Sequence, residues 1–427
     1  MKILFKNIRL LNPEQNLDKI ANLLIIDGII SKISETDIQV DNETEVVNAE
    51  NLIASPGLFD MHVHFREPGY EYKETIESGC KSAANGGFTG VVVMPNTNPT
   101  IDKPEVVEYI KQKAKDNLVE LLQAAAITQN REGKQLSPMY ELADHGVVYF
   151  TDDGTSVTDS NVMRRAFEYA SAKDFMLAQH AEDHKLTENF SANESELTGK
   201  LGLKGYPNVA EEIIVARDIM LAEFLGNRRY HVSHISTRGA VRIVRAAKAR
   251  GTRVTCEVTP HHFSLPDDLV ASYNSDLKMN PPLRTNDDID AMIDALKDGT
   301  IDCIATDHAP HSLHEKNVEF EKAPCGIVGL ETSLAVSLTY LYHQNHLTLN
   351  QIIEKMAINP RKLLRIEVPS ISEGNSANLT IFNPNEEWSV NKEKLMTKSK
   401  NTPYNKYQLK GKPYFTINNN KIHKCVL

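Results

Sequence analysis

Two histidines one residue apart, His62 and His64, stand in the stretch GLFDMHVHFREPG (57–69), and Arg66 follows two residues later. A β-strand directs residues i and i+2 to the same face, so both imidazoles would point to one side of such a strand. Two imidazoles at this spacing suit a borderline cation such as Zn²⁺. A lone pair of this kind is more often part of a surface or a polar core network, so a metal site requires partners elsewhere in the chain.

Polar side chains also follow several further apolar runs, at the point where each run ends. The runs are LFDMHVHF (58–65), GFTGVVVMPN (87–96), LVELLQAAAIT (118–128), GVVYFTDDG (146–154), FMLAQHAED (175–183), YHVSHIST (230–237), RVTCEVTPHH (253–262) and IDCIATDHAP (301–310). The polar residues of interest at these ends are Asn96, Asp152, Asp153, His180, His234, Asp307 and His311. They can form one site only if the fold brings the ends of the runs together.

Amphipathic stretches lie between these runs and read as helices. They include residues 103–117, 161–174, 210–226, 237–251 and 286–299, and most end in Gly or Asn after a basic last turn. Strands that alternate with helices predict right-handed βαβ units and a parallel sheet. Eight such runs over roughly 250 residues predict an α/β fold with a (β/α)8 TIM-type barrel. The long gaps after the fifth and seventh runs predict inserted loops.

Both ends of the chain have a different pattern, with short alternating runs typical of β-strands. In the first part, Asp27-Gly28 is a strong signal for a hairpin turn. The stretches 376–384 and 413–423 read as strands again. Because the two ends of a domain often lie close together, we expect residues 1–55 and 369–427 to form one small β-sandwich domain beside a barrel of residues 56–368.

In a parallel barrel, reactive groups lie where the strands end and the following loops begin. The eighth strand neighbours the first when the barrel closes, so Asp307 can complete a metal site with His62 and His64. His180 and His234, at the ends of adjacent strands, would supply a second pair. Two cations about 3.5–4 Å apart can activate a shared hydroxide and polarise a carbonyl.

A carboxylate from the fourth run would bridge these two sites, but spacing does not decide between Asp152 and Asp153. Each candidate also has a structural explanation. Asp-Gly at 153–154 is typical of a turn, Asn96 and Asn280 precede turn-like stretches, and His234 could be a buried hydrogen-bonded histidine. The combination of six candidate ligands at the appropriate strand ends favours the metal site.

Composition excludes several other classes of protein. The net charge is −10 with scattered Lys and Arg, which argues against nucleic-acid binding. No apolar run approaches the roughly 18 residues that a membrane span needs, and the first residues lack the pattern of a signal peptide. Five widely spaced cysteines without a CxxC motif suit a reducing compartment, so we expect a cytoplasmic protein.

Several longer motifs resemble those of the class I bacterial dihydroorotases of the amidohydrolase superfamily. They are DMHVHFREPG, GGFTGVVVMPNTNP, FTDDG, HISTRGAV, KMNPPLR, DCIATDHAPH and GIVGLET, and the similarity covers nearly the whole chain. The resemblance implies a zinc-dependent cyclic amidohydrolase. Its implied reaction is the reversible cyclisation of N-carbamoyl-L-aspartate to L-dihydroorotate in de novo pyrimidine (UMP) biosynthesis.

The resemblance also implies a role for each matching residue. It implies two Zn²⁺ ions per subunit, bridged by Asp153 and a hydroxide, with the ligands His62, His64, Asp307, His180 and His234. It implies that the substrate is contacted by His64, Arg66, Asn96, Asn280, His311, Pro324 and Cys325. Asp307 would also be the catalytic acid and base, and residues 311–326 would form a loop that covers the substrate.

Two alternative functions stay open. A hydantoinase or an allantoinase would carry a carboxylated lysine on the fourth strand, but GVVYFTDDG contains no lysine. A metal-free scaffold for a partner enzyme should have lost ligands, whereas this chain keeps all six candidates. The resemblance leaves both a homodimer and an association with aspartate transcarbamoylase open.

Overall fold

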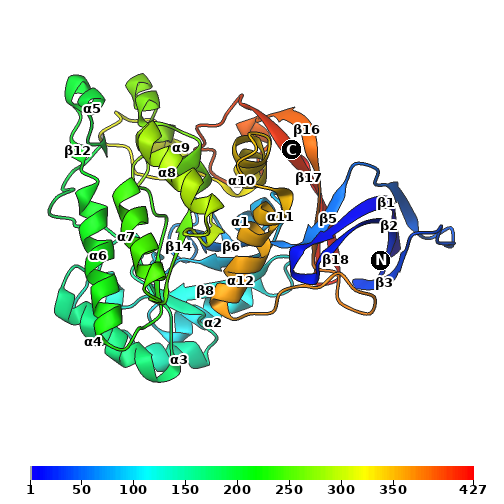
Figure 1. Ribbon diagram of the computed structural model, residues 1–427, viewed down its shortest axis with the longest axis horizontal. Helices are drawn as coiled ribbons and strands as arrows, with labels where there is room; N and C mark the ends of the chain where they lie inside the picture. The colour runs from blue at the N-terminus through cyan, green and yellow to red at the C-terminus, as the bar shows by residue number, and fades with distance from the viewer. Residues whose placement is uncertain (1) are drawn as a thin grey trace.

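Eight parallel strands form a barrel in the computed structural model, which describes residues 2–427 (Figure 1). The barrel strands are β6 (Leu58–Val63), β7 (Phe88–Val93), β8 (Glu120–Ala125), β9 (Tyr149–Thr151), β10 (Leu177–Gln179), β13 (Tyr230–Val232), β14 (Val254–Val258) and β15 (Cys303–Ile304). The ends of this sheet meet where Val63 forms a parallel bridge with His308, and the His64 amide donates to the His308 carbonyl at 2.9 Å. The predicted (β/α)8 barrel is confirmed.

Helices surround the barrel on its outer side (Figure 1). They are α1 (Ile76–Asn85), α2 (Pro104–Ala114), α3 (Met139–Asp144), α4 (Ser160–Ala170), α6 (Val209–Phe224), α7 (Arg238–Ala249), α8 (Asn286–Lys297), α10 (Leu330–Ser337), α11 (Leu349–Ile353) and α12 (Asn359–Leu364). Several begin at a side chain that accepts hydrogen bonds from the free amides of the first turn: Thr75 before α1, Asp159 before α4 and Thr237 before α7. Their apolar faces pack against the strands, so the amphipathic stretches form helices as predicted.

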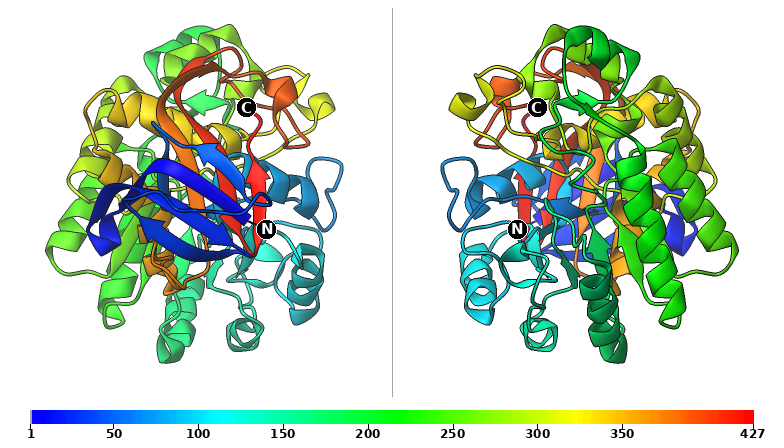
Figure 2. Two further views of the ribbon diagram at one scale, coloured as in Figure 1. Left: turned by 90° about the vertical axis from the view of Figure 1, so that its right-hand side faces the viewer. Right: turned by 90° about the vertical axis from the view of Figure 1, so that its left-hand side faces the viewer.

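The two ends of the chain form one eight-stranded sheet beside the barrel (Figure 2). Its strands are β1 (Lys2–Asn12), β2 (Leu17–Ile26), β3 (Ile29–Ser34), β4 (Glu45–Asn48), β5 (Ile53–Pro56), β16 (Leu379–Ser389), β17 (Gln408–Asn418) and β18 (Lys421–Lys424). β5 joins the two parts through its antiparallel pairing with β16, where Ala54 faces Ile381. Phe5 of β1 packs against Phe415 of β17 at 5.2 Å between ring centroids, although β5 and β16 lie between these two strands in the sheet. The sheet therefore folds over its own core, and the predicted small β domain from both termini is confirmed.

The hairpin between β2 and β3 has the turn that its sequence predicts. Asp27 and Gly28 are the only residues between the two strands, and their φ angles are 48° and 76°. Positive φ at both central positions is the geometry of a type I′ turn, whose twist matches that of the flanking strands.

The segment 390–407, between β16 and β17, leaves the small sheet and lies against the barrel. Asn401 donates to the carbonyls of Ala309 and Gly326 at 3.0 and 2.9 Å, and its Oδ1 accepts from the His311 amide at 3.0 Å. The C-terminal part of the chain therefore holds loops at the rim of the barrel, which the sequence did not predict. The division at residues 55–56 and 368–369 stays a proposal, supported by the change of sheet at Gly57 between β5 and β6.

The two predicted inserted loops lie over the same end of the barrel and pack together. The first follows β10 and contains β11 (Ala192–Asn193), α5 (Glu196–Leu201) and β12 (Gly205–Tyr206), and the second follows β14. A third loop, after β15, contains α9 (Leu313–Lys316). A buried cluster of Ala192, Leu203, Val270 and Phe320 joins all three. Among residues 2–427, no helix has both the length and the apolar character of a membrane span.

Candidate metal centre and active site

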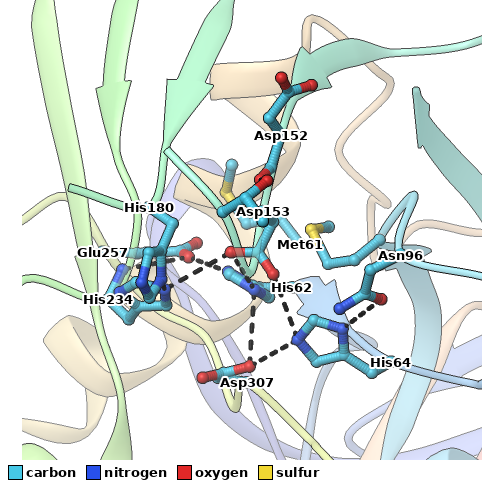
Figure 3. Close-up of polar contacts among 12 residues, drawn as sticks. Met61, His62, His64, Asn96, Asp152, Asp153, His180, His234, Glu257 and Asp307 are labelled. Atoms are coloured by element: carbon cyan, nitrogen blue, oxygen red, sulfur yellow. Dashed lines mark hydrogen bonds and ion pairs between the residues drawn. The ribbon is translucent and has the colours of Figure 1, made fainter. Parts of the chain in front are cut away.

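The six predicted ligands meet at the carboxyl end of the barrel strands (Figure 3). They are His62, His64, Asp153, His180, His234 and Asp307, and each is 5% exposed or less. The first two come from the end of β6, and the others lie one to three residues after the ends of β9, β10, β13 and β15. Closure of the barrel brings together side chains that lie up to 245 positions apart in the chain, as the distance from residue 62 to residue 307 illustrates.

Asp153 occupies the centre of the cluster, and its two oxygens face different histidines. Oδ1 lies 3.3 Å from His62 Nε2 and 3.5 Å from His234 Nε2, whereas Oδ2 lies 3.4 Å from His64 Nε2. Asp152 points away from the cluster (Figure 3) and accepts hydrogen bonds from the amide and the hydroxyl of Thr128. Of the two carboxylates that the sequence left open, Asp153 therefore has the geometry that a bridging ligand needs.

Asp307 and His234 reach the cluster through an uncommon backbone conformation. Asp307 Oδ1 lies 2.8 Å from His64 Nε2 and 3.5 Å from His62 Nε2. The φ angles of Asp307 and His234 are 47° and 31°, in the left-handed region that few residues other than glycine adopt. Such conformations cost about 1–3 kcal/mol each and are concentrated at functional sites. Both side chains contact other residues of the cluster from this conformation.

His180 and His234 form the second pair that the sequence predicted. His180 Nδ1 lies 2.8 Å from His234 Nε2, so this nitrogen faces the cluster. His180 Nε2 lies 2.7 Å from Glu182 Oε2, which also accepts from Asn280 Nδ2 at 2.9 Å. Glu182 therefore orients His180 and Asn280 together.

The donor atoms of the cluster suit a cation. Three groups of three residues each place their ligand atoms within 4.8 Å of one another, and together they comprise all six candidates. His62 Nε2 and Asp153 Oδ1 are buried without a hydrogen-bond partner in the described part of the chain, which is costly unless another group satisfies them. Burial opposes ionisation of Asp153, but His62 and His234 hold its pKa well below the ordinary value. Although burial opposes protonation, Asp153 raises the pKa of His62 and of His234, so these imidazoles hold the positive charge that a metal ion would supply in place of their ring protons.

Glu257 is a site residue that the sequence reasoning missed. Its Oε1 lies 2.6 Å from His62 Nδ1, on the side of the ring that faces away from the cluster (Figure 3). Although burial opposes ionisation, His62 lowers the pKa of Glu257 to about 2. A carboxylate in this position keeps the proton on Nδ1 and leaves Nε2 free for a metal ion. The signal in the sequence was a lone acidic residue inside the apolar run RVTCEVTPHH.

We predict that Glu257→Gln weakens metal binding by about 10- to 100-fold, the range for partners of metal-ligating histidines. The amide removes the negative charge that favours the correct tautomer of His62. Competition with a chromophoric chelator measures the affinity, and circular dichroism checks the fold. Glu331→Gln is the control, because Glu331 is also a buried carboxylate but binds Ser82 and Asn85 instead. Equal losses in both variants would contradict a specific role for Glu257.

A cavity of about 240 Å³ opens beside the cluster and contains most of the predicted substrate residues. Its border includes His64, Arg66, Asn96, Asn280, His311 and Cys325. Pro324, in contrast, does not border the cavity in the described structure; its carbonyl accepts from Lys316 Nζ at 2.9 Å. The peptide geometry of the loop directs this carbonyl toward a buried lysine, which the sequence pattern did not indicate.

The polar residues around the cavity are already held by neighbours. Asn96 Oδ1 lies 2.8 Å from His64 Nδ1, so this amide orients a candidate ligand. Arg66 Nε donates to the Pro310 carbonyl at 3.2 Å, and burial lowers the pKa of Arg66 to about 10. The guanidinium therefore stays charged at neutral pH and supplies the cavity with a cation suited to a carboxylate.

Fold and site together define the class: a TIM-type barrel with a candidate metal site of histidines and aspartates at the carboxyl ends of its strands. A family model described as dihydro-orotase-like matches residues 51–240. The chain is 47% identical to a dihydroorotase of Geobacter metallireducens, over 99% of both chains. It is also 47% identical to a dihydroorotase of Clostridioides difficile, over 98% of this chain and 99% of that one. The chain belongs to the dihydroorotase family of cyclic amidohydrolases.

Solved structures with lower sequence identity share the fold. An L-hydantoinase (dihydropyrimidinase) from Arthrobacter aurescens matches with a TM-score of 0.86 and 22% identity, over 100% of this chain and 97% of that one. A D-hydantoinase (dihydropyrimidinase) from Thermus sp. matches with a TM-score of 0.82 and 22% identity, over 99% and 95%. At this identity the likeness extends to the architecture, a barrel with a small β domain.

Proposed function

We propose that this chain is a zinc-dependent dihydroorotase, which interconverts N-carbamoyl-L-aspartate and L-dihydroorotate in de novo pyrimidine biosynthesis. The observation that carries the proposal is the position of Asp153 among His62, His64 and His234, beside a cavity that contains Arg66. Family membership selects this reaction among those of cyclic amidohydrolases. The absence of a lysine in GVVYFTDDG is consistent with a bridging aspartate in place of a carboxylated lysine.

We propose two zinc ions, with His62, His64 and Asp307 holding one, His180 and His234 holding the other, and Asp153 bridging. The unpartnered atoms His62 Nε2 and Asp153 Oδ1 support this assignment. When bound, the metal pair supplies Lewis acidity, which lowers the pKa of a water molecule and polarises a carbonyl. Imidazole and carboxylate ligands are those that zinc accepts in catalytic sites.

Asp307 is our candidate for proton transfer. It borders the cavity, and although burial opposes ionisation, His62 and His64 lower its pKa, so it is a carboxylate at neutral pH. In ring opening, water adds to the ring carbonyl and the C–N bond breaks. Asp307 takes the proton from the water and delivers it to the departing nitrogen. In ring closure, the same residue takes the proton from the carbamoyl nitrogen.

Arg66, Asn96 and His311 are our candidates for binding the carboxylate that stays outside the reacting bonds. A guanidinium offers a planar pair of donors that matches the two oxygens of a carboxylate. Asn280 and Cys325 border the same cavity and would contact the ring. The loop 311–326 supplies His311 and Cys325, which supports a role for it in covering the substrate.

Turnover assays with a metal analysis test the proposal. We expect hydrolysis of dihydroorotate, little activity on hydantoin or allantoin, and close to two zinc ions per chain by elemental analysis. Faster turnover of hydantoin or allantoin would contradict the proposed specificity. A folded protein without zinc and without turnover would instead support a scaffold function.

Cytoplasmic location and oligomeric state are further parts of the proposal. All five cysteines are free thiols, which suits a reducing compartment. We propose a homodimer in which α6 meets its counterpart. This helix exposes Ile213, Met220 and Phe224 at 44, 68 and 73%, an unusual apolar face for a monomer.

Opposite charges beside the exposed apolar face of α6 suit a symmetric contact between two copies. The pairs Arg164–Glu168 and Arg250–Glu223 provide both signs. Light scattering on the purified chain distinguishes this dimer from a monomer. Mixing with aspartate transcarbamoylase tests the association that the family resemblance leaves open.

A further inference from the structure

His311, at the border of the cavity, lies between two cationic side chains. Lys73 Nζ is 3.3 Å from His311 Nδ1, and Arg66 Nη2 is 3.5 Å from His311 Nε2. His311 and Arg66 are 7 and 8% exposed and both border the cavity, whereas Lys73 is outside its border. Lys73 therefore reaches the substrate pocket only through the imidazole.

The two cations compete for one lone pair, because a neutral imidazole has one acceptor nitrogen and one N–H. An ammonium group has donors only, so its contact with Nδ1 requires Nδ1 to accept and places the proton on Nε2. Burial first, and then Arg66 and Lys73, lower the pKa of His311, so the ring is neutral as this arrangement requires. The shorter of the two contacts, that with Lys73, favours the Nε2–H tautomer.

Glu315 keeps Lys73 in place and charged. Its Oε1 lies 2.7 Å from Lys73 Nζ, and the rings of Tyr70 and Tyr72 lie 5.4 and 5.5 Å from the same nitrogen. Glu315 belongs to α9, in the loop that also contains His311, so the ion pair joins two loops at the rim. Glu315 Oε2 also faces His311 Nδ1, but their distance of 3.8 Å is too long for a hydrogen bond.

With the proton on Nε2, His311 and Arg66 present two donors that cannot bond to each other. Their nitrogens are 3.5 Å apart and both side chains border the cavity. A carboxylate, which has only acceptor oxygens when ionised, satisfies both donors at once. If a neutral edge of the substrate ring lay here instead, the guanidinium of Arg66 would have no charged partner.

We propose that Lys73 is a positioning residue, which sets the tautomer of His311 and thereby builds, with Arg66, a two-donor site for the substrate carboxylate. This inference rests on the proposed function, because it assigns the anionic group of that substrate to a place in the cavity. Lys73 itself touches neither the substrate nor the metal ligands.

Kinetics of Lys73→Met test the proposal, with Lys73→Arg as the conservative variant and Lys322→Met as the control. Arg also has donors only and should hold the tautomer, whereas Lys322 lies in the same loop as His311 with its side chain 72% exposed. We expect Lys73→Met to raise KM for both N-carbamoyl-L-aspartate and dihydroorotate by about tenfold or more, the effect of one charge-assisted hydrogen bond. Its kcat and zinc content should change little. Unchanged KM, or an equal loss of kcat and zinc, would overturn the proposal.

The tautomer is measured directly by ¹⁵N NMR of the histidine rings in the substrate-free protein, with the His311 signals assigned by their loss in His311→Gln. We expect Nε2–H in the wild type and in Lys73→Arg, and a shift toward Nδ1–H in Lys73→Met. Glu315→Gln, which releases the ammonium group without changing Lys73, should shift the tautomer in the same direction and serves if Lys73→Met does not fold. An Nδ1–H ring in the wild type would overturn the inference. A wild type that does not turn over dihydroorotate would refute the proposed function, while the NMR result would still decide the role of Lys73 toward His311.

Discussion

Asp307→Asn is expected to lower the turnover of dihydroorotate by about 10³-fold, within the range of general acid and base catalysis. The amide keeps an oxygen that can face His64, whose Nε2 lies 2.8 Å from Asp307 Oδ1 in the wild type. It cannot, however, take a proton from water or deliver one to the ring nitrogen. We therefore expect the variant to bind most of its metal while it loses nearly all turnover in both directions.

Elemental analysis and kcat, measured on the same preparation, test this expectation for Asp307. Asp102→Asn is the control, because Asp102 is a buried carboxylate that accepts from the Asn130 amide, outside the metal cluster. Near-normal turnover in Asp307→Asn would refute the proton-transfer role. Loss of metal in proportion to the loss of turnover would show that Asp307 acts mainly as a ligand.

The neighbouring residues Asp152 and Asp153 should respond to the same substitution in opposite ways. In Asp153→Asn, the amide nitrogen would face an imidazole or a cation where the wild type has carboxylate oxygens, 3.3–3.5 Å from three histidines. We expect this variant to lose most of its bound zinc and to fall to background activity. The loss arises because each oxygen of Asp153 serves a different part of the cluster.

Asp152→Asn is the matched control and should keep its metal. This substitution should instead lower the stability of the fold, because Asp152 accepts hydrogen bonds from both the amide and the hydroxyl of buried Thr128. Weakening such buried hydrogen bonds lowers the free energy of unfolding by about 1–3 kcal/mol. Chemical denaturation and zinc analysis of the two variants separate these effects. Zinc loss in Asp152→Asn with retention in Asp153→Asn would reverse the assignment.

The sequence by itself determined the architecture and the set of candidate ligands. Apolar runs of strand length between amphipathic stretches are local patterns, and they predicted the barrel, because helix and strand periodicity depend only on neighbouring residues. The Asp27-Gly28 turn could be predicted for the same reason, because it depends on adjacent residues. The candidate ligands could be found because parallel strands bring their carboxyl ends to one rim, a rule that holds for any such barrel.

Only the tertiary structure decided which side chains at that rim meet. Asp152 and Asp153 follow the same strand, and what separates them is the contact of Asp152 with Thr128, a residue of the preceding strand's loop. The left-handed backbone at Asp307 turns its carboxylate toward His64 once regular strand alternation has ended. The alternation of side chains between the two faces of a strand predicts where each side chain points within the strand, but not after its last residue.

The partners behind the site depended on the tertiary structure even more strongly. Glu257 meets His62 across 195 positions, Lys73 meets His311 across 238, and Asn401 returns from the small domain to hold the His311 loop. Such pairs form when the barrel closes and the loops pack. The helix and strand periodicity of the local sequence therefore cannot predict them. The physical reason is that hydrogen bonds between distant segments are set by where the packed strands place the backbone. The sequence therefore predicted the candidate ligands, apart from the choice between Asp152 and Asp153, and the fold decided their orientation and their partners.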